Sequence, residues 1–201
     1  MRVLLTNDDG PLNDQFSSYV RPFVQHLKKN YPHWDLTVCV PHTQKSWIGK
    51  AHFAGKKLSA QFLYSKIDSD DNSYIGPFIQ PQISLKDSKL PRNILNPEIS
   101  RDDIEWILID GTPASCANIG LHHLSDKKFD LVISGPNVGR NTSVAYITSS
   151  GTVGAAMESV ITGGTRSIAI SWAYFNGEKD VSEEIMDMAA KRSLQILSLI
   201  H

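Results

Sequence analysis

Residues 2–10 read RVLLTNDDG, a short apolar run that ends in a polar turn with two adjacent carboxylates. The run shows no alternation of apolar and polar residues, so both of its faces are expected to be buried. This pattern predicts a central β-strand with Asp8 and Asp9 at its carboxyl end. Later runs of the same character predict further buried strands at residues 36–40, 105–109, 130–134 and 167–172.

Segments with the spacing of amphipathic helices occur at residues 15–30, 114–124, 153–162 and 181–200. Buried strands that alternate with helices predict a mainly parallel sheet covered on both faces, which is an α/β protein with three α/β/α layers. Residues 51–103 depart from this alternation, because short β-like pieces at 57–62 and 72–79 are mixed with several prolines. We expect a β-hairpin and loop insertion there.

Composition predicts one soluble domain over residues 1–201, with 41% hydrophobic and 20% charged residues. Lys and Arg number 20 against 21 Asp and Glu, without a long basic run, which argues against binding a nucleic-acid polymer. The first apolar run is too short for a signal peptide or a membrane-spanning helix. Cys39 and Cys116 lie in apolar stretches typical of free buried thiols. These features predict a cytoplasmic protein without membrane contact.

Neutral oxygen ligands follow two further predicted strands. Ser46 comes after the strand at 36–40, and Asn137 comes after the strand at 130–134. Ligands of open parallel sheets bind beyond the carboxyl ends of the strands, where Asp8 and Asp9 are also expected. A set of Asp, Asp, Ser and Asn without His or Cys favours magnesium or manganese over zinc, with calcium as an alternative. Taken alone, Asp-Asp-Gly is more typical of an ordinary turn.

Small hydroxyl and glycine residues stand before the helix predicted at 153–162, namely Ser150, Gly151 and Thr152. Backbone N–H groups and the positive end of the helix dipole at such a position suit a phosphate group. Taken alone, this triplet is also a good N-cap. Beside an acidic metal site, it favours a phosphate ester as the ligand.

An ordered series of motifs in this chain resembles that of the SurE survival-protein family. The motifs are NDDG at 7–10, VPHTQKS at 40–46, GTPASC at 111–116, SGPNVGRN at 134–141, SGTVGAA at 150–156 and SIAIS at 167–171. The match runs from residue 1 to about residue 175, and an ordered series is far more specific than any single motif.

The resemblance implies a Rossmann-like, metal-dependent phosphomonoesterase, a nucleotidase or acid phosphatase, that acts on nucleoside monophosphates or similar small substrates. It implies that the metal is held by Asp8, Asp9, Ser46 and Asn137, with Asp8 or Asp9 orienting the attacking water. Side chains expected to face the phosphate or the rest of the substrate are Asn7, Asn141, Ser150, Gly151 and Thr152, with Lys50 from the loop after Ser46.

Residues 45–52 replace a shorter loop of small residues, so the substrate preference of bacterial members does not carry over. Residues 11–19 depart from the bacterial pattern and resemble the fungal branch of the family. In that branch, a SurE-like unit precedes a tubulin-tyrosine-ligase-like (ATP-grasp) domain in larger cytoplasmic proteins associated with RNA decay and P-bodies. The last predicted helix lacks Gly, Asn or Pro at its end, so we expect the domain to be truncated and the natural chain to continue. The resemblance is also compatible with a homodimer.

Two other functions stay open at this level. A catalytically silent SurE-like interaction module would keep the fold without turnover, and a metal-dependence assay separates it from an enzyme. A nicotinamide or flavin enzyme would need G-x-G-x-x-G after the first strand, where this chain has NDDG.

In the loop after Ser46, His52 is a candidate general acid, and Trp47 is expected either to stack on a base or to pack against its own fold.

Overall fold

The computed structural model describes residues 1–10, 17–68, 73–83, 94–173 and 182–199. Within these residues the sheet has seven strands in the order β4-β3-β5-β2-β1-β6-β7. Neighbours among β5, β2, β1, β6 and β7 pair parallel, whereas β3 pairs antiparallel with both β5 and β4. The strands are β1 (Arg2–Thr6), β2 (Asp35–Pro41), β3 (Ala60–Ser65), β4 (Ile75–Phe78), β5 (Ile104–Ile109), β6 (Leu131–Val138) and β7 (Ser167–Trp172).

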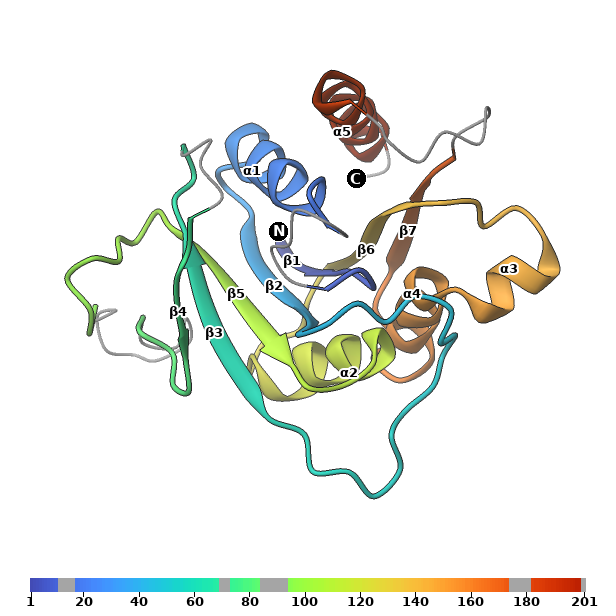
Figure 1. Ribbon diagram of the computed structural model, residues 1–201, viewed down its shortest axis with the longest axis horizontal. Helices are drawn as coiled ribbons and strands as arrows, with labels where there is room; N and C mark the ends of the chain where they lie inside the picture. The colour runs from blue at the N-terminus through green and yellow to red at the C-terminus, as the bar shows by residue number, and fades with distance from the viewer. Residues whose placement is uncertain (11–16, 69–72, 84–93, 174–181, 200–201) are drawn as a thin grey trace.

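The helices cover both faces of the sheet (Figure 1). One face carries α1 (Val20–Asn30) and α5 (Glu183–Ser198), and the other carries α2 (Pro113–His123) and α4 (Gly151–Ile161). The three-layer α/β/α architecture expected from the sequence is therefore confirmed. None of the helices in the described ranges combines the length and the apolar character needed to cross a bilayer.

β1 shows why the apolar runs have no alternation. Val3 and Leu5 belong to the hydrophobic core under α1 and α5, whereas Leu4 belongs to the core under α2. All three side chains are fully buried. Cys39 and Cys116 lie in the second core as free thiols, as the sequence predicts. Helices on both faces thus require apolar residues at every position of the central strands.

The insertion predicted between residues 51 and 103 contains the antiparallel pair β3 and β4 at one edge of the sheet (Figure 1). The six-residue helix α3 (Val144–Ser149) was not predicted, because its apolar residues are exposed and show no buried stripe. Residues 15, 16, 72, 181 and 200, which fall within predicted elements, lie outside the described ranges.

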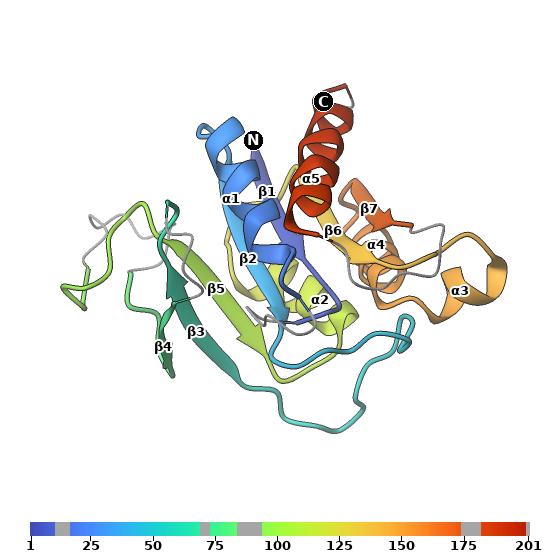
Figure 2. The ribbon, with the colours of Figure 1, turned by 45° about the horizontal axis from the view of Figure 1, so that its top comes forward.

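β1 is the strand at which the strand order reverses, because the chain adds β2 and β5 on one side of β1 and later adds β6 and β7 on the other side. It pairs with β2 on one side and with β6 on the other, and all three strands are parallel. The loops that follow them therefore leave the same edge, and the loop after β2 extends toward α3 before it returns to β3 (Figure 2). Such a switch point is the usual place for a ligand in an open α/β sheet.

Candidate active site

Asp8 and Asp9 follow β1 and are almost completely buried, with exposed fractions of 2% and 4%. The turn that holds them depends on Asn7, whose carbonyl oxygen Oδ1 accepts the backbone N–H of Asp9 at 2.7 Å. The amide of Asn7 in turn donates to the carbonyl of Pro136 at 2.6 Å. One side chain therefore fixes the acidic turn to the carboxyl-terminal part of β6.

Three hydrogen-bond donors surround the carboxylate of Asp9. Ser46 donates its hydroxyl to Oδ1 at 2.6 Å, and Gln44 donates its amide to the same oxygen at 3.0 Å. Tyr19, at the N-cap of α1, donates its phenol to Oδ2. Burial, and then the charge of Asp9, raises the pKa of Tyr19 above its ordinary value, so the phenol keeps its proton and remains a donor.

Asp8 faces the first turn of α4. Thr152 donates its hydroxyl to Oδ1 of Asp8 at 2.6 Å. Gly151 lies against the same side chain, because a Cβ at this glycine would be 2.8 Å from the Cβ of Asp8. Burial and repulsion from Asp9 raise the pKa of Asp8 to about 7, although the hydrogen bonds from Thr152 oppose the shift. Two crowded carboxylates of this kind would be stabilised by a nearby cation.

Asn137 is brought to the same edge by the pairing of β1 with β6. Thr6 is opposite Ser134, and Asp9 and Asn137 each lie three residues beyond that pair. The backbone N–H of Val138 donates to the phenol oxygen of Tyr19 at 3.4 Å, so the residue after Asn137 contacts the same tyrosine as Asp9. A Cβ at Gly139 would lie 3.2 Å from the amide nitrogen of Asn137, so glycine leaves room for this side chain.

The N-terminus of α4 is capped and tied to the sheet. Ser150 is the N-cap, and its hydroxyl accepts the backbone N–H of Val153 at 3.2 Å. Ser134 on β6 donates its hydroxyl to the carbonyl of Thr152 at 2.7 Å. The positive end of the α4 dipole is therefore held directly beside Asp8.

Two of the residues expected at the substrate have partners elsewhere. Lys50 forms an ion pair at 2.6 Å with Glu158, a side chain that is 2% exposed in the second turn of α4. Asn141 donates its amide to the hydroxyl of Ser171 on β7 at 2.7 Å. Ser171 is the β7 partner of Asn137, so Asn141 is linked to the carboxyl edge of the sheet through β7.

The donor set fits a hard divalent cation. Within the described residues, no Lys, Arg or His lies within 4.0 Å of the Asp8 or Asp9 carboxylate. The same residues contain no group of three or more His, Cys, Asp and Glu side chains that could hold a metal. A cation here would be bound by two carboxylates with the neutral oxygens of Ser46 and Asn137, which suits magnesium or manganese better than zinc.

None of the histidines in the described ranges lies within 4.0 Å of the Asp8 or Asp9 carboxylate. His122 and His123 are exposed near the end of α2, as expected for a surface helix. His42 faces Asp110 at 3.5 Å. His52 lies between the hydroxyl of Ser115 at 3.1 Å and the carboxylate of Glu158 at 3.4 Å.

Tyr19 and Gln44 are site residues that the sequence did not predict. Tyr19 is at an apolar position of a helical pattern, where only the tertiary fold reveals that its phenol reaches Asp9. Gln44 lies two residues before Ser46 in one of the motifs, and that proximity is the signal that could have identified it.

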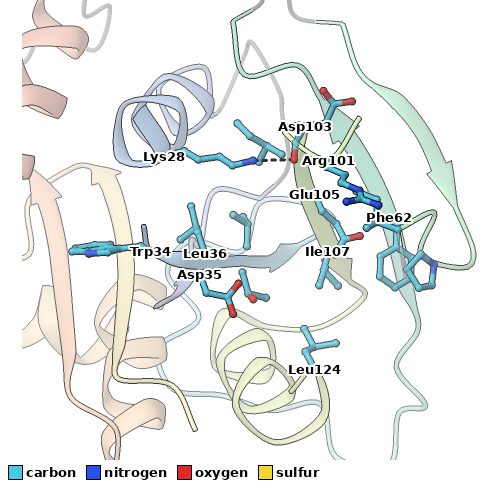
Figure 3. Close-up of a pocket in the computed structure, with 15 residues that line it drawn as sticks. Lys28, Trp34, Asp35, Leu36, Phe62, Arg101, Asp103, Glu105, Ile107 and Leu124 are labelled. Atoms are coloured by element: carbon cyan, nitrogen blue, oxygen red, sulfur yellow. Dashed lines mark hydrogen bonds between the residues drawn. The ribbon is translucent and has the colours of Figure 1, made fainter. Parts of the chain in front are cut away.

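A separate pocket of about 180 Å³ lies at the amino ends of β2 and β5, away from the acidic turn (Figure 3). Lys28 at its rim donates to the carbonyls of Asp102 and Asp103. The carboxylate of Asp103 accepts from Lys66, and that of Glu105 accepts from Tyr64. Because these charged groups are used to hold the fold together, the pocket is a weaker candidate for a catalytic site.

Comparison with known proteins identifies the family of this chain. The family described as "Survival protein SurE" matches residues 3–200. A Saccharomyces cerevisiae protein named probable tubulin–tyrosine ligase PBY1 is 73% identical over 98% of this chain, which spans 26% of that protein. The 5′-nucleotidase SurE of Carboxydothermus hydrogenoformans is 33% identical over 90% of the chain.

The structural comparison gives the same family. The crystal structure of the SurE protein from Aquifex aeolicus matches with a TM-score of 0.63 and 26% identity, covering all of this chain and 60% of the other. The chain spans about half the length of the bacterial relative and about a quarter of the yeast protein. The sequence indicated both the family and its fungal branch. The chain belongs to the SurE family.

Proposed function

We propose that this chain is a divalent-metal-dependent phosphomonoesterase that hydrolyses nucleoside monophosphates or similar small phosphate esters. The observation that carries the proposal is the pair of buried carboxylates, Asp8 and Asp9, next to the N-terminus of α4 and without a cationic partner among the described side chains. Relatives named 5′-nucleotidase support the substrate class.

Asp8, Asp9, Ser46 and Asn137 would hold magnesium or manganese. When bound, such an ion polarises a phosphoryl oxygen and lowers the pKa of a coordinated water. The surrounding side chains fix the carboxylates: Thr152 orients Asp8, while Ser46, Gln44 and Tyr19 orient Asp9. This arrangement preorganises the acidic pair before substrate binds.

The first turn of α4 would bind the phosphate group. Its dipole and backbone N–H groups favour negative charge, and Gly151 lets the helix start in van der Waals contact with Asp8. Phosphoryl transfer depends mainly on positioning and on electrostatic stabilisation of the transferring group. No covalent intermediate on a protein side chain is required.

A catalytically silent interaction module is the second candidate. It is favoured by one observation, that the 73% identical yeast relative is named for a ligase and is about four times as long as this chain. The presence of all four proposed ligands favours the enzyme.

Hydrolysis of AMP, measured by phosphate release with Mg²⁺ or Mn²⁺ and with a chelator, separates the two candidates. The enzyme predicts turnover that the chelator abolishes and that falls by several orders of magnitude in Asp8→Asn and Asp9→Asn. Folding of both variants is checked by circular dichroism. Metal-independent turnover, or turnover unaffected by these substitutions, would contradict the proposal.

A further inference from the structure

Two exposed aromatic side chains lie on segments next to the proposed site, the loop after β2 and the helix α3. Trp47 is 69% exposed and Tyr146 is 41% exposed, and their rings meet edge to face with centroids 5.7 Å apart at 74°. Trp47 directly follows Ser46, whose hydroxyl contacts Asp9. Tyr146 lies on α3, four residues before Ser150, the N-cap of α4. The pair therefore adjoins both the proposed metal site and the proposed phosphate site.

The loop that carries Trp47 is held tightly by backbone contacts. The N–H of Gly49 donates to the carbonyl of Ser149 at 2.8 Å. A Cβ at Gly49 would lie 2.7 Å from the carbonyl oxygen of Thr148, and one at Gly154 would lie 2.4 Å from the carbonyl oxygen of Gly49. The loop thus lies directly on the end of α3 and the start of α4, so the position of Trp47 is set by rigid elements.

Side-chain contacts anchor the same loop three and four residues beyond Trp47. Lys50 pairs with the buried Glu158, and Thr112 donates its hydroxyl to the carbonyl of Ala51 at 2.5 Å. These anchors come from α4 and from the N-cap of α2. The loop is consequently fixed between two helices, with the indole left outside.

Packing does not explain the conformation of Trp47. Its φ is 62°, and it is the one non-glycine residue with positive φ in the described part of the chain. A bulky side chain at such an angle is strained, and the large exposed ring recovers little energy by burial. A strained and solvent-facing aromatic ring beside a candidate active site indicates a ligand contact.

We propose that Trp47 and Tyr146 form the face on which the base of a nucleoside monophosphate stacks while its phosphate lies at the acidic turn. In such a molecule one sugar joins the base to the phosphate, and Trp47 is adjacent in the chain to Ser46, whose hydroxyl donates to Asp9. Stacking uses the π-face that every base has, so the site accepts purines and pyrimidines alike. This inference rests on the proposed function and assigns its substrate specificity to named residues.

The test compares AMP with ribose 5-phosphate, which has the same phosphate ester but no base. For each protein, the ratio of kcat/KM for AMP to kcat/KM for ribose 5-phosphate is measured with Mn²⁺. The ratio is expected to fall about 10-fold in Trp47→Ala and to be largely restored in Trp47→Phe. Tyr146→Ala shifts the ratio in the same direction. A thermal melt of each variant checks that the fold is intact.

Losses that are equal for the two substrates, or a ratio that stays at the wild-type value in Trp47→Ala, would overturn the inference. If the wild-type chain hydrolyses neither compound, the proposed function fails, and adenosine then tests the stacking face alone. Trp34 and Trp106 are buried and Trp172 is partly buried, so quenching by adenosine reports mainly on Trp47. Quenching that is present in the wild type and lost in Trp47→Phe supports the stacking face, and absent quenching refutes it.

Discussion

The hydroxyl of Thr152 donates to Oδ1 of Asp8 at 2.6 Å, joining residues 144 positions apart in the sequence. Through this bond the first turn of α4 and the end of β1 act as one unit. The carboxylate thereby gains an oriented donor and the positive end of a helix dipole. The contact links the proposed metal site to the proposed phosphate site.

Replacing Thr152 by Val removes this donor with little change in shape. We expect metal affinity or kcat to fall by about 10-fold or more, because Asp8 would lose the group that orients it. Thr152→Ser keeps the hydroxyl and is the matched control. Equal activity of the Val and Ser variants with AMP and Mn²⁺ would show that the bond has no role in catalysis.

Gly151→Ala tests the close approach of α4 to β1. The new methyl carbon would lie 2.8 Å from the Cβ of Asp8 and 3.1 Å from the carbonyl oxygen of Lys45, so the acidic turn must move. We expect most phosphatase activity to be lost because the acidic turn is displaced, and the melting temperature to fall because the added methyl group also crowds Lys45 and Pro113. Gly55→Ala is a control for activity alone, because its φ of 72° strains alanine but nothing lies within 4 Å of the added Cβ, and it should keep its activity.

Tyr19→Phe removes the phenol that donates to Asp9. We expect Mn²⁺ affinity, measured by calorimetric titration, to weaken by about 10-fold because the carboxylate loses an orienting partner. Tyr31→Phe removes a phenol that donates to the carbonyl of Leu194, far from the site, and should leave metal affinity unchanged. If the Mn²⁺ affinity were similar in the two variants, Tyr19 would contribute only to packing of the hydrophobic core.

Glu158 makes stability depend on pH. Burial raises its pKa, but hydrogen bonds from Lys50, Asn118, His52 and Thr162 outweigh burial and lower the pKa from 4.5 to about 2. A lowered carboxylate pKa stabilises the fold fully above pH 4.5, and that contribution is lost as pH falls toward 2.

The wild type should therefore be more stable than Glu158→Gln at pH 7, with the difference shrinking between pH 4.5 and 2. Urea unfolding at a series of pH values measures the free energies. Asp126→Asn, at an exposed site, serves as the control, and its free energy of unfolding should change with pH as that of the wild type does. A difference that stays constant with pH would contradict the ion pairing of Glu158.

The sequence predicts the parts of the site that follow from strand order. Asp9 follows β1 and Ser46 follows β2, whereas Asn137 lies near the carboxyl end of β6, which extends past the strand end expected at residue 134. Parallel pairing brings these positions to one edge. Contacts that depend on helix placement were not predictable. Tyr19 has the pattern of a core residue until α1 is set over the end of β1.

Lys50 shows a second limit of reasoning from the sequence. Its place in the loop after Ser46 suggests a contact with substrate, whereas in the structure it pairs with Glu158. Glu158 is a single acidic residue in an otherwise apolar and small-residue helix, and periodicity alone does not show that it is buried. Partners of buried charges are set by loop packing, which leaves no regular signal in the sequence.

A calorimetric titration of the chain with Mn²⁺ tests whether Asp8 and Asp9 bind one divalent ion. We expect one saturable site per chain that is lost in Asp8→Asn and in Asp9→Asn and retained in Asp126→Asn. Failure of the wild type to bind Mn²⁺, or equal binding by all four proteins, would contradict this expectation.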